Sequence, residues 1–363
     1  MARRMPPRRY NALVLIVVHG QDALAAIISL DWRLGFLEPD SGCGLSETMP
    51  RELCLFSHET FGLRTVPPSP LIPGEVLVQT RYSRVQHGLD VLRAGEFGSA
   101  ASVREPLPLS TWSVGKVAAG GKSGCFPEGE WVYGLMLHAD YQVCAPERLK
   151  PLEWIKPEFA VFTGAGVVAL NCVRQAGIRY GDRAAVWGMG TLGLMALQYV
   201  LASGAREVIA VDPLPARLDV ARRLGATDVC LSIHAWLRER NASNGQDSEI
   251  DVGLDLSGCE TSLREAAVAV RRGGILAAGA APSYSPRVIH AVREQCGEKS
   301  IQFLMPETRE DDPRLVEMVE HSLAAKRVIV WPIISHLVPF EQAPSVYEKI
   351  QTDPGTYLQV LLT

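Results

Sequence analysis

The sequence has no Cys-x-x-Cys pair, although it contains eight cysteines in 363 residues. Zinc ribbons and thioredoxin-type redox sites both need such pairs, so the sequence excludes these two classes. The cysteines are scattered, and reduced thiols in a cytoplasmic protein are the simplest interpretation. They are Cys43, Cys54, Cys125, Cys144, Cys172, Cys230, Cys259 and Cys296.

The sequence also lacks an excess of positive charge and a long apolar run. Its formal net charge of −4 gives no electrostatic footprint for nucleic acid. The apolar run 12–18 follows four arginines, as in a signal peptide, but it is too short to span a bilayer and no cleavage site follows. We therefore expect neither nucleic acid nor a membrane as a partner. Residues 1–48 are expected to form an N-terminal extension, poorly ordered, before the regular domains.

A glycine-rich segment carries the clearest motif of the chain. Three glycines with the spacing G-x-G-x-x-G follow an apolar strand, 183–187, and precede a helix through 194–200. The first glycine allows a sharp turn, the second a close approach of pyrophosphate, and the third tight packing of helix on sheet. The start of the helix offers unpaired N–H groups to phosphates. The contacts expected here are Gly188, Gly190, Thr191, Leu192 and Gly193.

An acidic residue, Asp212, ends the next strand, nineteen residues after the last glycine of the motif. A carboxylate at this place accepts hydrogen bonds from the ribose hydroxyls of NAD and repels the extra phosphate of NADP, so the sequence predicts NAD(H) as cofactor. Arg217 either stacks on the adenine or is a solvated arginine at a helix start. Ser257 and Gly279 end later strands and are further candidates for contact with the cofactor.

The order of elements predicts two domains of different type. Short strands separated by Gly and Pro fill residues 51–144, and from 184 onwards strands alternate with helices. This alternation indicates an α/β fold with a Rossmann-type, doubly wound parallel sheet. The tail, 338–362, returns to β character and is expected to rejoin the first domain. The expected divisions are 49–165 for a β-rich catalytic domain, 166–323 for the nucleotide-binding domain and 324–363 for the return.

This organisation resembles the medium-chain dehydrogenase/reductase superfamily, which includes the alcohol dehydrogenases. The resemblance covers residues 49–363, and it implies that the β-rich domain is GroES-like. It is carried by segments along the whole region: Pro73–Val78, Phe126–Gly134, His138–Tyr141, Val173–Arg183, the glycine turn and Pro339–Pro344.

Most alcohol dehydrogenases of that superfamily hold a catalytic zinc, and the resemblance places its ligand positions at residues that cannot bind it. The first falls near Gln86, the second in Ser110-Thr111-Trp112 and the third in Gly164-Ala165-Gly166. A zinc site needs three or four Cys, His or acidic ligands. The chain is therefore expected to be zinc-independent, similar to the branch with bacteriochlorophyllide-type and sugar or cyclitol dehydrogenases of secondary metabolism. Gln86, Thr111 and Trp112 are expected to shape the substrate pocket.

Without a metal, a side chain has to exchange the proton of the reacting hydroxyl, and histidine is suited to this near neutral pH. His138 ranks first because its segment resembles a substrate-facing one, and His87 ranks second. Asp90 is a third candidate. Each has a structural alternative, as a buried histidine, a surface histidine and a helix cap respectively.

The leading hypothesis is a zinc-independent, NAD(H)-dependent oxidoreductase that interconverts a secondary alcohol and a ketone in a small molecule such as a sugar or cyclitol. Two alternatives remain open: an NAD(P)H-dependent C=C reductase of the enoyl or quinone type, and a dinucleotide-binding protein without turnover. The apolar segment 301–305 is expected to form an edge strand, and by resemblance to the superfamily we expect a homodimer.

Overall fold

The structure is a computed structural model that describes residues 49–57, 60–88, 90, 106–120, 125–244, 249–280, 283–307 and 309–363. All of them belong to one compact unit of the chain. The expected N-terminal extension, 1–48, lies outside the described residues. Within the described ranges, none of the helices combines the length and the apolar composition needed to cross a bilayer.

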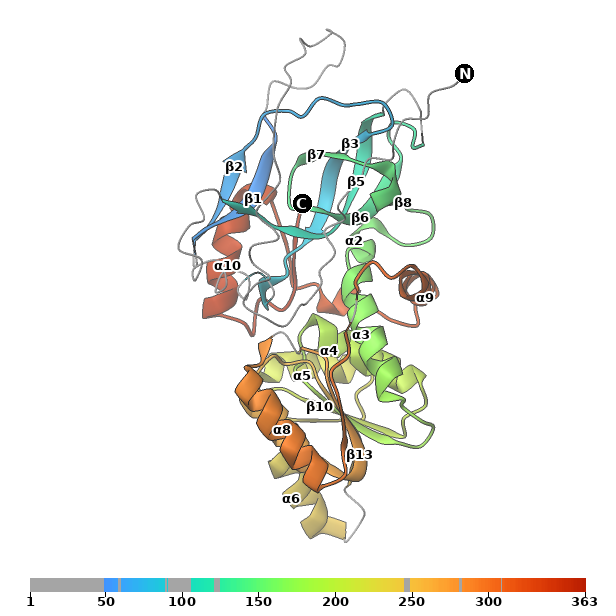
Figure 1. The fold of residues 1–363 in the computed structure, drawn as a ribbon, viewed down its shortest axis with the longest axis vertical. Coiled ribbons are helices and arrows are strands. Elements are labelled where there is room, and N and C mark those ends of the chain that lie inside the picture. Colours follow the sequence, from blue (N-terminus) through green and yellow to red (C-terminus); the bar gives the residue numbers. More distant parts are fainter. Residues whose placement is uncertain are drawn as a thin grey trace, which may run out of the picture. The chain divides into compact units, whose positions relative to one another are not determined.

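The first part of the chain forms the β-rich domain (Figure 1). A small sheet has the order β2-β1-β4, and a larger sheet has the order β15-β16-β3-β5-β6-β8, with β7 paired to β3. Alternate side chains of the larger sheet gather in one apolar cluster that includes Val76, Val117 and Met136. The strands are β1 (Arg51–Ser57), β2 (Thr60–Thr65), β3 (Val76–Arg84), β4 (Leu107–Pro108), β5 (Ser110–Gly120), β6 (Trp131–Leu137), β7 (Tyr141–Cys144) and β8 (Leu149–Pro151).

The last segment of the chain completes this sheet. Strand β16 (Val360–Leu362) pairs in antiparallel register with β3 and in parallel register with β15 (His336–Val338). The tail thus rejoins the β-rich sheet as expected, but it is not β throughout, because helix α10 (Ala343–Thr352) lies between these strands. Its buried residues recur at helical spacing, and they pack on the small sheet.

The second part of the chain forms a six-stranded parallel sheet with the order β11-β10-β9-β12-β13-β14. The strand order reverses between β9 and β12, as in doubly wound dinucleotide-binding folds. The predicted fold class is therefore confirmed. The strands are β9 (Arg183–Trp187), β10 (Glu207–Val211), β11 (Asp228–Cys230), β12 (Ile250–Asp255), β13 (Val270–Ala278) and β14 (Gln302–Leu304).

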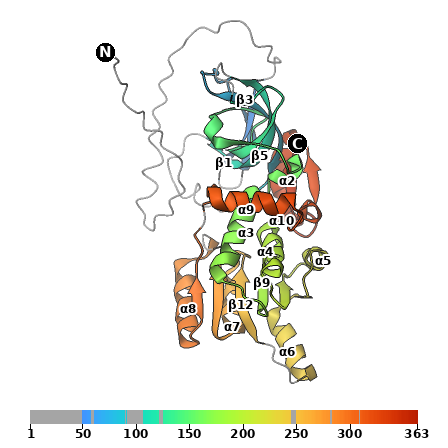
Figure 2. The ribbon, with the colours of Figure 1, turned by 90° about the vertical axis from the view of Figure 1, so that its right-hand side faces the viewer.

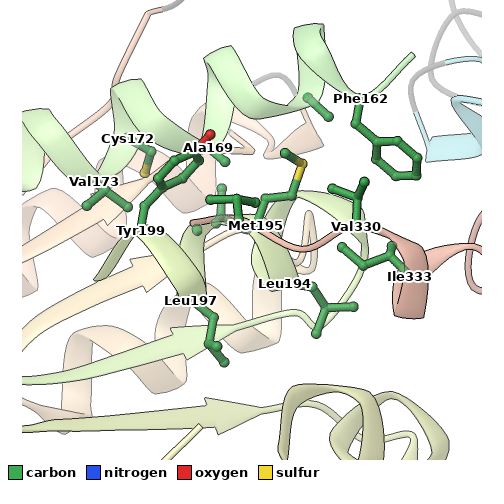
Figure 3. Packing of buried hydrophobic residues seen from close by; sticks show 14 of the residues in the cluster. Phe162, Ala169, Cys172, Val173, Leu194, Met195, Leu197, Tyr199, Val330 and Ile333 are labelled. Atoms are coloured by element: carbon green, nitrogen blue, oxygen red, sulfur yellow. The ribbon is translucent and has the colours of Figure 1, made fainter. Parts of the chain in front are cut away.

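Helices cover both faces of the parallel sheet (Figures 1 and 2). On one face α3 and α4 pack together through Cys172, Met195 and Tyr199, which Figure 3 shows at close range. On the other face α7 and α8 pack together. The helices of this region are α2 (Pro157–Ala160), α3 (Thr163–Ala176), α4 (Thr191–Ala202), α5 (Pro215–Arg223), α6 (Ile233–Asn244), α7 (Glu260–Ala269), α8 (Pro286–Glu298) and α9 (Pro313–Ala324).

Candidate cofactor and substrate site

The three glycines of the turn between β9 and α4 each have a different steric environment. Gly188 has a φ of +87°, and a Cβ there would lie 2.5 Å from the Cα of Ser257. A Cβ on Gly193 would lie 1.8 Å from the carbonyl oxygen of Gly188, so only glycine fits at both positions. A Cβ on Gly190 would meet nothing within 4 Å. The turn is thus closed behind its first and third glycines and open above the second, where a pyrophosphate needs room.

Helix α4 begins directly after this open glycine. Gly190 is the cap residue and makes no side-chain cap, so the N–H groups at the helix start receive no side-chain acceptor. Thr191 and Leu192 are the first two residues of the helix. The start of a twelve-residue helix with uncapped N–H groups is a favourable place for a phosphate.

The carboxylate of Asp212 lies at the end of β10, next to the turn. Oδ2 accepts a hydrogen bond of 2.8 Å from the backbone N–H of Met189, and Oδ1 accepts one of 2.9 Å from Leu214. The residue is 3% exposed. Each oxygen keeps a further lone pair for a ligand hydroxyl. The guanidinium of Arg217 lies 3.8 Å from Oδ2 and also donates to the carbonyl oxygen of Pro354.

A cavity of about 730 Å³ opens beside these residues. Its volume is within the range of cofactor pockets. Five predicted cofactor contacts line it, namely Gly188, Gly190, Asp212, Arg217 and Ser257. Gly279 is different, because a Cβ there would lie 2.5 Å from a methyl carbon of Leu256 and 2.9 Å from the sulfur of Cys172. This glycine permits close packing of the end of β13 beneath α3, and it does not line the cavity.

Ser257 is held in place by the carboxylate of Asp255. The Ser257 hydroxyl donates to Oδ1 of Asp255 at 2.6 Å, and its backbone N–H donates to the same oxygen at 2.9 Å. Asp255 is completely buried, and burial raises the pKa of its carboxyl to about 6. Asp255 therefore orients Ser257, which lines the cavity.

The side chains at the expected zinc positions do not form a zinc site. The amide nitrogen of Gln86 donates to the hydroxyl of Thr111 at 2.9 Å, and that hydroxyl donates to the carbonyl oxygen of Arg84 at 2.8 Å. Gly164 offers no side chain. Among the described residues no group of three His, Cys, Asp or Glu side chains is placed to hold a metal ion. An amide, a hydroxyl and a glycine do not fit Zn²⁺, which needs thiolate, imidazole or carboxylate ligands.

Other side chains fill the space next to Gly164. A Cβ on Gly164 would lie 2.3 Å from Nε1 of Trp112 and 2.8 Å from Oε2 of Glu310. Trp112 is buried and also packs against Tyr133, with the ring centroids 6.0 Å apart. Trp112 is thus a contact between the β-rich domain and the first turn of α3.

His138 lies inside the β-rich domain. Its side chain is completely buried, and Nδ1 lies 2.9 Å from the hydroxyl of Ser83. Ser83 is opposite Ser113 in the β3–β5 pair, and side chains alternate along a strand, so His138 lies on the face of the sheet opposite to Trp112. This position favours a structural role for His138 over proton transfer.

His87 and Asp90 lie close together, beside Tyr347 of α10. The hydroxyl of Tyr347 donates to Oδ2 of Asp90 at 2.8 Å, and the ring of His87 is 6.0 Å from the Tyr347 ring. Nε2 of His87 is buried without a hydrogen-bond partner. Burial and the positive charge of Arg217 lower the pKa of His87 below its ordinary value. His87 is therefore neutral near pH 7 and faces the nucleotide-binding part of the molecule.

Three residues of this region were not predicted from the sequence: Arg84, Glu310 and Gln359. Gln359, the residue before β16, is buried, and its Oε1 accepts a hydrogen bond from the hydroxyl of Thr191. Only Arg84 gives a signal in the sequence, because it lies within a predicted strand and arginine is almost never fully buried unless it is paired.

Comparison with protein families finds one match, to the family described as "Zinc-binding dehydrogenase", over residues 191–320. Sorbitol dehydrogenase of Ovis aries is 30% identical over 200 residues, which are 54% of this chain and 53% of the relative. D-xylulose reductase A of Aspergillus niger is 30% identical over 193 residues, 52% of each chain. The chain thus spans about half the length of the curated relatives it matches.

Solved structures of the same fold cover more of the chain. Galactitol-1-phosphate dehydrogenase from Escherichia coli superimposes with a TM-score of 0.70 at 18% identity, covering 86% of this chain and 99% of that one. 2R,3R-butanediol dehydrogenase from Bacillus subtilis superimposes with a TM-score of 0.68 at 16% identity, covering 86% and 99%. At such identities the likeness establishes the fold alone.

Proposed function

We propose that this chain, which shares its fold and its sequence relatives with the medium-chain dehydrogenase/reductase superfamily, is a nicotinamide-dependent oxidoreductase acting on a secondary alcohol or ketone. The resemblance to that superfamily is supported by the family match over residues 191–320 and by the curated relatives, and the superimposed structures share its fold. Relatives named as sorbitol dehydrogenase and xylulose reductase support a polyol or ketose as substrate. A sugar or cyclitol of secondary metabolism is the substrate class that we propose.

The observation that carries the proposal is the pairing of Asp212 with the open glycine turn. The turn leaves room above Gly190 for a pyrophosphate, and the buried carboxylate stands where the adenosine ribose of a dinucleotide would lie. When bound, a nicotinamide dinucleotide supplies the hydride or accepts it. We propose NAD(H) over NADP(H), because a 2′-phosphate beside the carboxylate would place like charges in close contact, although Arg217 offsets part of this repulsion.

We further propose that turnover does not need zinc, since the donor set at Gln86, Thr111 and Gly164 does not suit the ion. The hydroxyl proton then leaves through a side chain, and His87 is the candidate we favour. Its Nε2 is without a partner and its lowered pKa keeps the ring neutral, ready to accept a proton.

A homodimer joined through the edge strand β14 is also proposed, and light scattering at micromolar concentration would measure its mass.

Titration of the protein with NADH and NADPH, followed by cofactor fluorescence, tests the cofactor. NADH should bind at least about tenfold more tightly, which is about 1.4 kcal/mol. Asp212→Asn should narrow that preference, whereas Asp219→Asn, at an exposed position on α5, should not change it. Equal affinities of the wild-type protein for the two cofactors would overturn the choice of NAD(H).

Turnover is tested separately, with NAD⁺ and a panel of polyols and cyclitols, and with NADH and the corresponding ketones. Mass spectrometry of the products distinguishes oxidation of a C–OH from reduction of a C=C bond. Binding of NADH without turnover of any substrate in the panel would contradict the proposed oxidoreductase activity.

A further inference from the structure

Two buried N–H donors on the β-rich domain have no acceptor. Nε of Arg84 and Nε1 of Trp112 are both without a hydrogen-bond partner, and the two residues are 6% and 4% exposed. A buried donor without an acceptor costs about 1–3 kcal/mol. Such groups are few in native proteins, and each calls for an explanation such as a ligand that supplies the acceptor.

The two donors belong to neighbouring residues of adjacent strands. Ser83 in β3 pairs with Ser113 in β5 in antiparallel register, and this is the last pair of the ladder. If the register is continued by one residue, Arg84 stands opposite Trp112. Side chains directly opposite in such a pair have Cβ atoms about 4.5–5.5 Å apart. Both point away from the sheet face that carries Ser83 and His138. The donors thus share one face.

The groups that surround this pair come from the nucleotide-binding part of the chain. Gly164, in the first turn of α3, has no side chain and so leaves room for the Trp112 indole, and Oε2 of Glu310 lies next to it. Glu310 belongs to the segment between β14 and α9, which follows the carboxyl end of the parallel sheet, where ligands of this fold class bind. The donors therefore lie on the side where hydride transfer is expected.

The charges around Arg84 favour a neutral ligand. Burial lowers the pKa of the guanidinium, and the negative charges of Glu310 and Asp90 act in the opposite direction. An arginine remains protonated in proteins, and these two carboxylates are near enough to act on its charge. A carboxylate or phosphate group on the substrate would add further negative charge beside them. A hydroxyl or carbonyl oxygen adds none.

We propose that Nε–H of Arg84 and Nε1–H of Trp112 together bind the reacting oxygen of a neutral polyol or ketose. This inference rests on the proposed oxidoreductase function and names the substrate class of the same site. During reduction a hydride adds to the carbonyl carbon, the C=O π electrons move to the oxygen, and the oxygen then takes a proton from the protonated form of His87, the form that arises when neutral His87 accepts the hydroxyl proton in the oxidation direction. Two fixed donors stabilise the negative charge on that oxygen, and fixed donors of this kind act strongly in a site without water.

Trp112→Phe is the first test, because it keeps an aromatic ring in the buried position and removes only the N–H and part of the ring volume. Loss of one such donor typically lowers kcat by about 10²–10³-fold. We expect that loss in kcat for ketone reduction, with the Kd of NADH unchanged. Trp236→Phe is the matched control, since Trp236 is also buried and donates to Asp228, far from this site in the sheet. It should lower stability and leave kcat unchanged.

A spectroscopic measurement tests the contact without turnover. Isobutyramide, whose amide carbonyl is not reduced by NADH, is titrated into the NADH complex of protein labelled with ¹⁵N at the indole nitrogens. The indole N–H signal of Trp112 is assigned by its absence from the spectrum of Trp112→Phe. In the wild-type protein this signal should move downfield on titration, as expected when a free N–H gains an acceptor, while the other indole signals stay in place. Arg84→Gln, if it folds, should weaken isobutyramide binding.

The outcomes separate the two proposals. If NADH does not bind, the proposed function fails and the inference fails with it. If NADH binds and ketones are reduced, but Trp112→Phe keeps its kcat and the Trp112 signal does not move, only the inference is overturned. If a phosphorylated ketose is reduced with a higher kcat/KM than its neutral counterpart, the proposed substrate class is wrong.

Discussion

The hydroxyl of Thr191 donates a hydrogen bond of 2.7 Å to Oε1 of Gln359, and this contact joins the first residue of α4 to the residue that precedes β16. Gln359 is 4% exposed, and its amide nitrogen donates to the carbonyl oxygen of Val85 at 2.9 Å. Val85 precedes Gln86 and His87. One buried amide therefore fixes the glycine turn against the segment that carries the candidate proton acceptor.

Gln359→Leu should weaken this connection. The substitution keeps most of the volume but leaves the buried Val85 carbonyl without this partner, which costs about 1–3 kcal/mol, and it also removes the acceptor of the half-buried Thr191 hydroxyl. We expect a lower free energy of unfolding in urea and a higher Kd for NADH. Gln351→Leu, at an exposed position near the end of α10, is the control and should change neither. An unchanged Kd for NADH in Gln359→Leu would show that the bridge does not position the turn.

His87→Gln should remove the acid limb of the pH profile for alcohol oxidation. The base has to be neutral to accept the proton, and burial together with Arg217 lowers the pKa of His87 below 6.5. The acid limb of the wild-type profile should therefore lie at a lower pH than that of a base with the pKa of an ordinary histidine. Loss of a general base typically lowers turnover by about 10²–10⁴-fold. His290→Gln, at an exposed position on α8, should leave both rate and profile unchanged.

His138→Ala should act on stability. His138 is completely buried and bonded to Ser83, so its removal leaves a cavity and an unpaired hydroxyl, with a cost of about 1–3 kcal/mol. Urea unfolding measures this loss, and initial rates measured on the folded protein should give a kcat near that of the wild type. A large fall in kcat with an unchanged free energy of unfolding would instead support His138 as the proton-transfer residue.

Asp255→Asn should stabilise the protein at high pH. The carboxyl has its pKa raised to about 6 in the folded state, from 3.8 in an unfolded chain. Between these values the folded state binds more protons than the unfolded state, so the contribution of Asp255 to stability falls as pH rises from 4 to 6. The asparagine side chain does not titrate, so the stability of the variant does not fall in this way. It should gain up to roughly 3 kcal/mol over the wild type above pH 6, and a difference that does not vary between pH 4 and pH 8 would contradict the assignment.

Chelation tests the proposal that zinc is not needed. Dialysis against EDTA or 1,10-phenanthroline should leave turnover unchanged, because Gln86, Thr111 and Gly164 do not offer ligands that suit the ion. Metal analysis of the purified protein should find less than one zinc per chain. Zinc bound near one per chain, and lost together with activity, would show that the ligands lie elsewhere in the chain.

The sequence predicted the nucleotide-binding part of the fold well, because its signals are local. Apolar strands alternate with helices over short stretches of sequence. The glycine spacing is equally local, and it has steric causes at Gly188 and Gly193. The sequence predicts no helix at α10, because its apolar residues Ala343, Val346, Tyr347 and Ile350 directly follow a β segment. Their spacing of three and four residues is helical, and this is the periodicity that the structure shows.

The cofactor contacts were predictable for the same reason, and the substrate side was not. The environments of Arg84 and Trp112 depend on cross-strand pairing between β3 and β5, and on Glu310, which is distant in sequence. The sequence does not give the register of strand pairing, so it cannot show which face of the sheet a side chain occupies. His138 is an example, because its substrate-facing position was expected from its segment alone, and a shift of one residue moves a side chain from one face of a sheet to the other.

The pairing of β16 with β3 joins residue 361 to residue 84, with the whole nucleotide-binding part of the chain between them. On a ribosome the parallel sheet can therefore form while its flanking sheet still lacks a strand. Closing the β-rich sheet has to await the synthesis of its last strand and the closure of a very long loop, which slows folding. During that interval the edge of β3 that β16 later covers is open to pairing with other chains. Translation would thus expose this edge as the aggregation-prone part of the nascent protein.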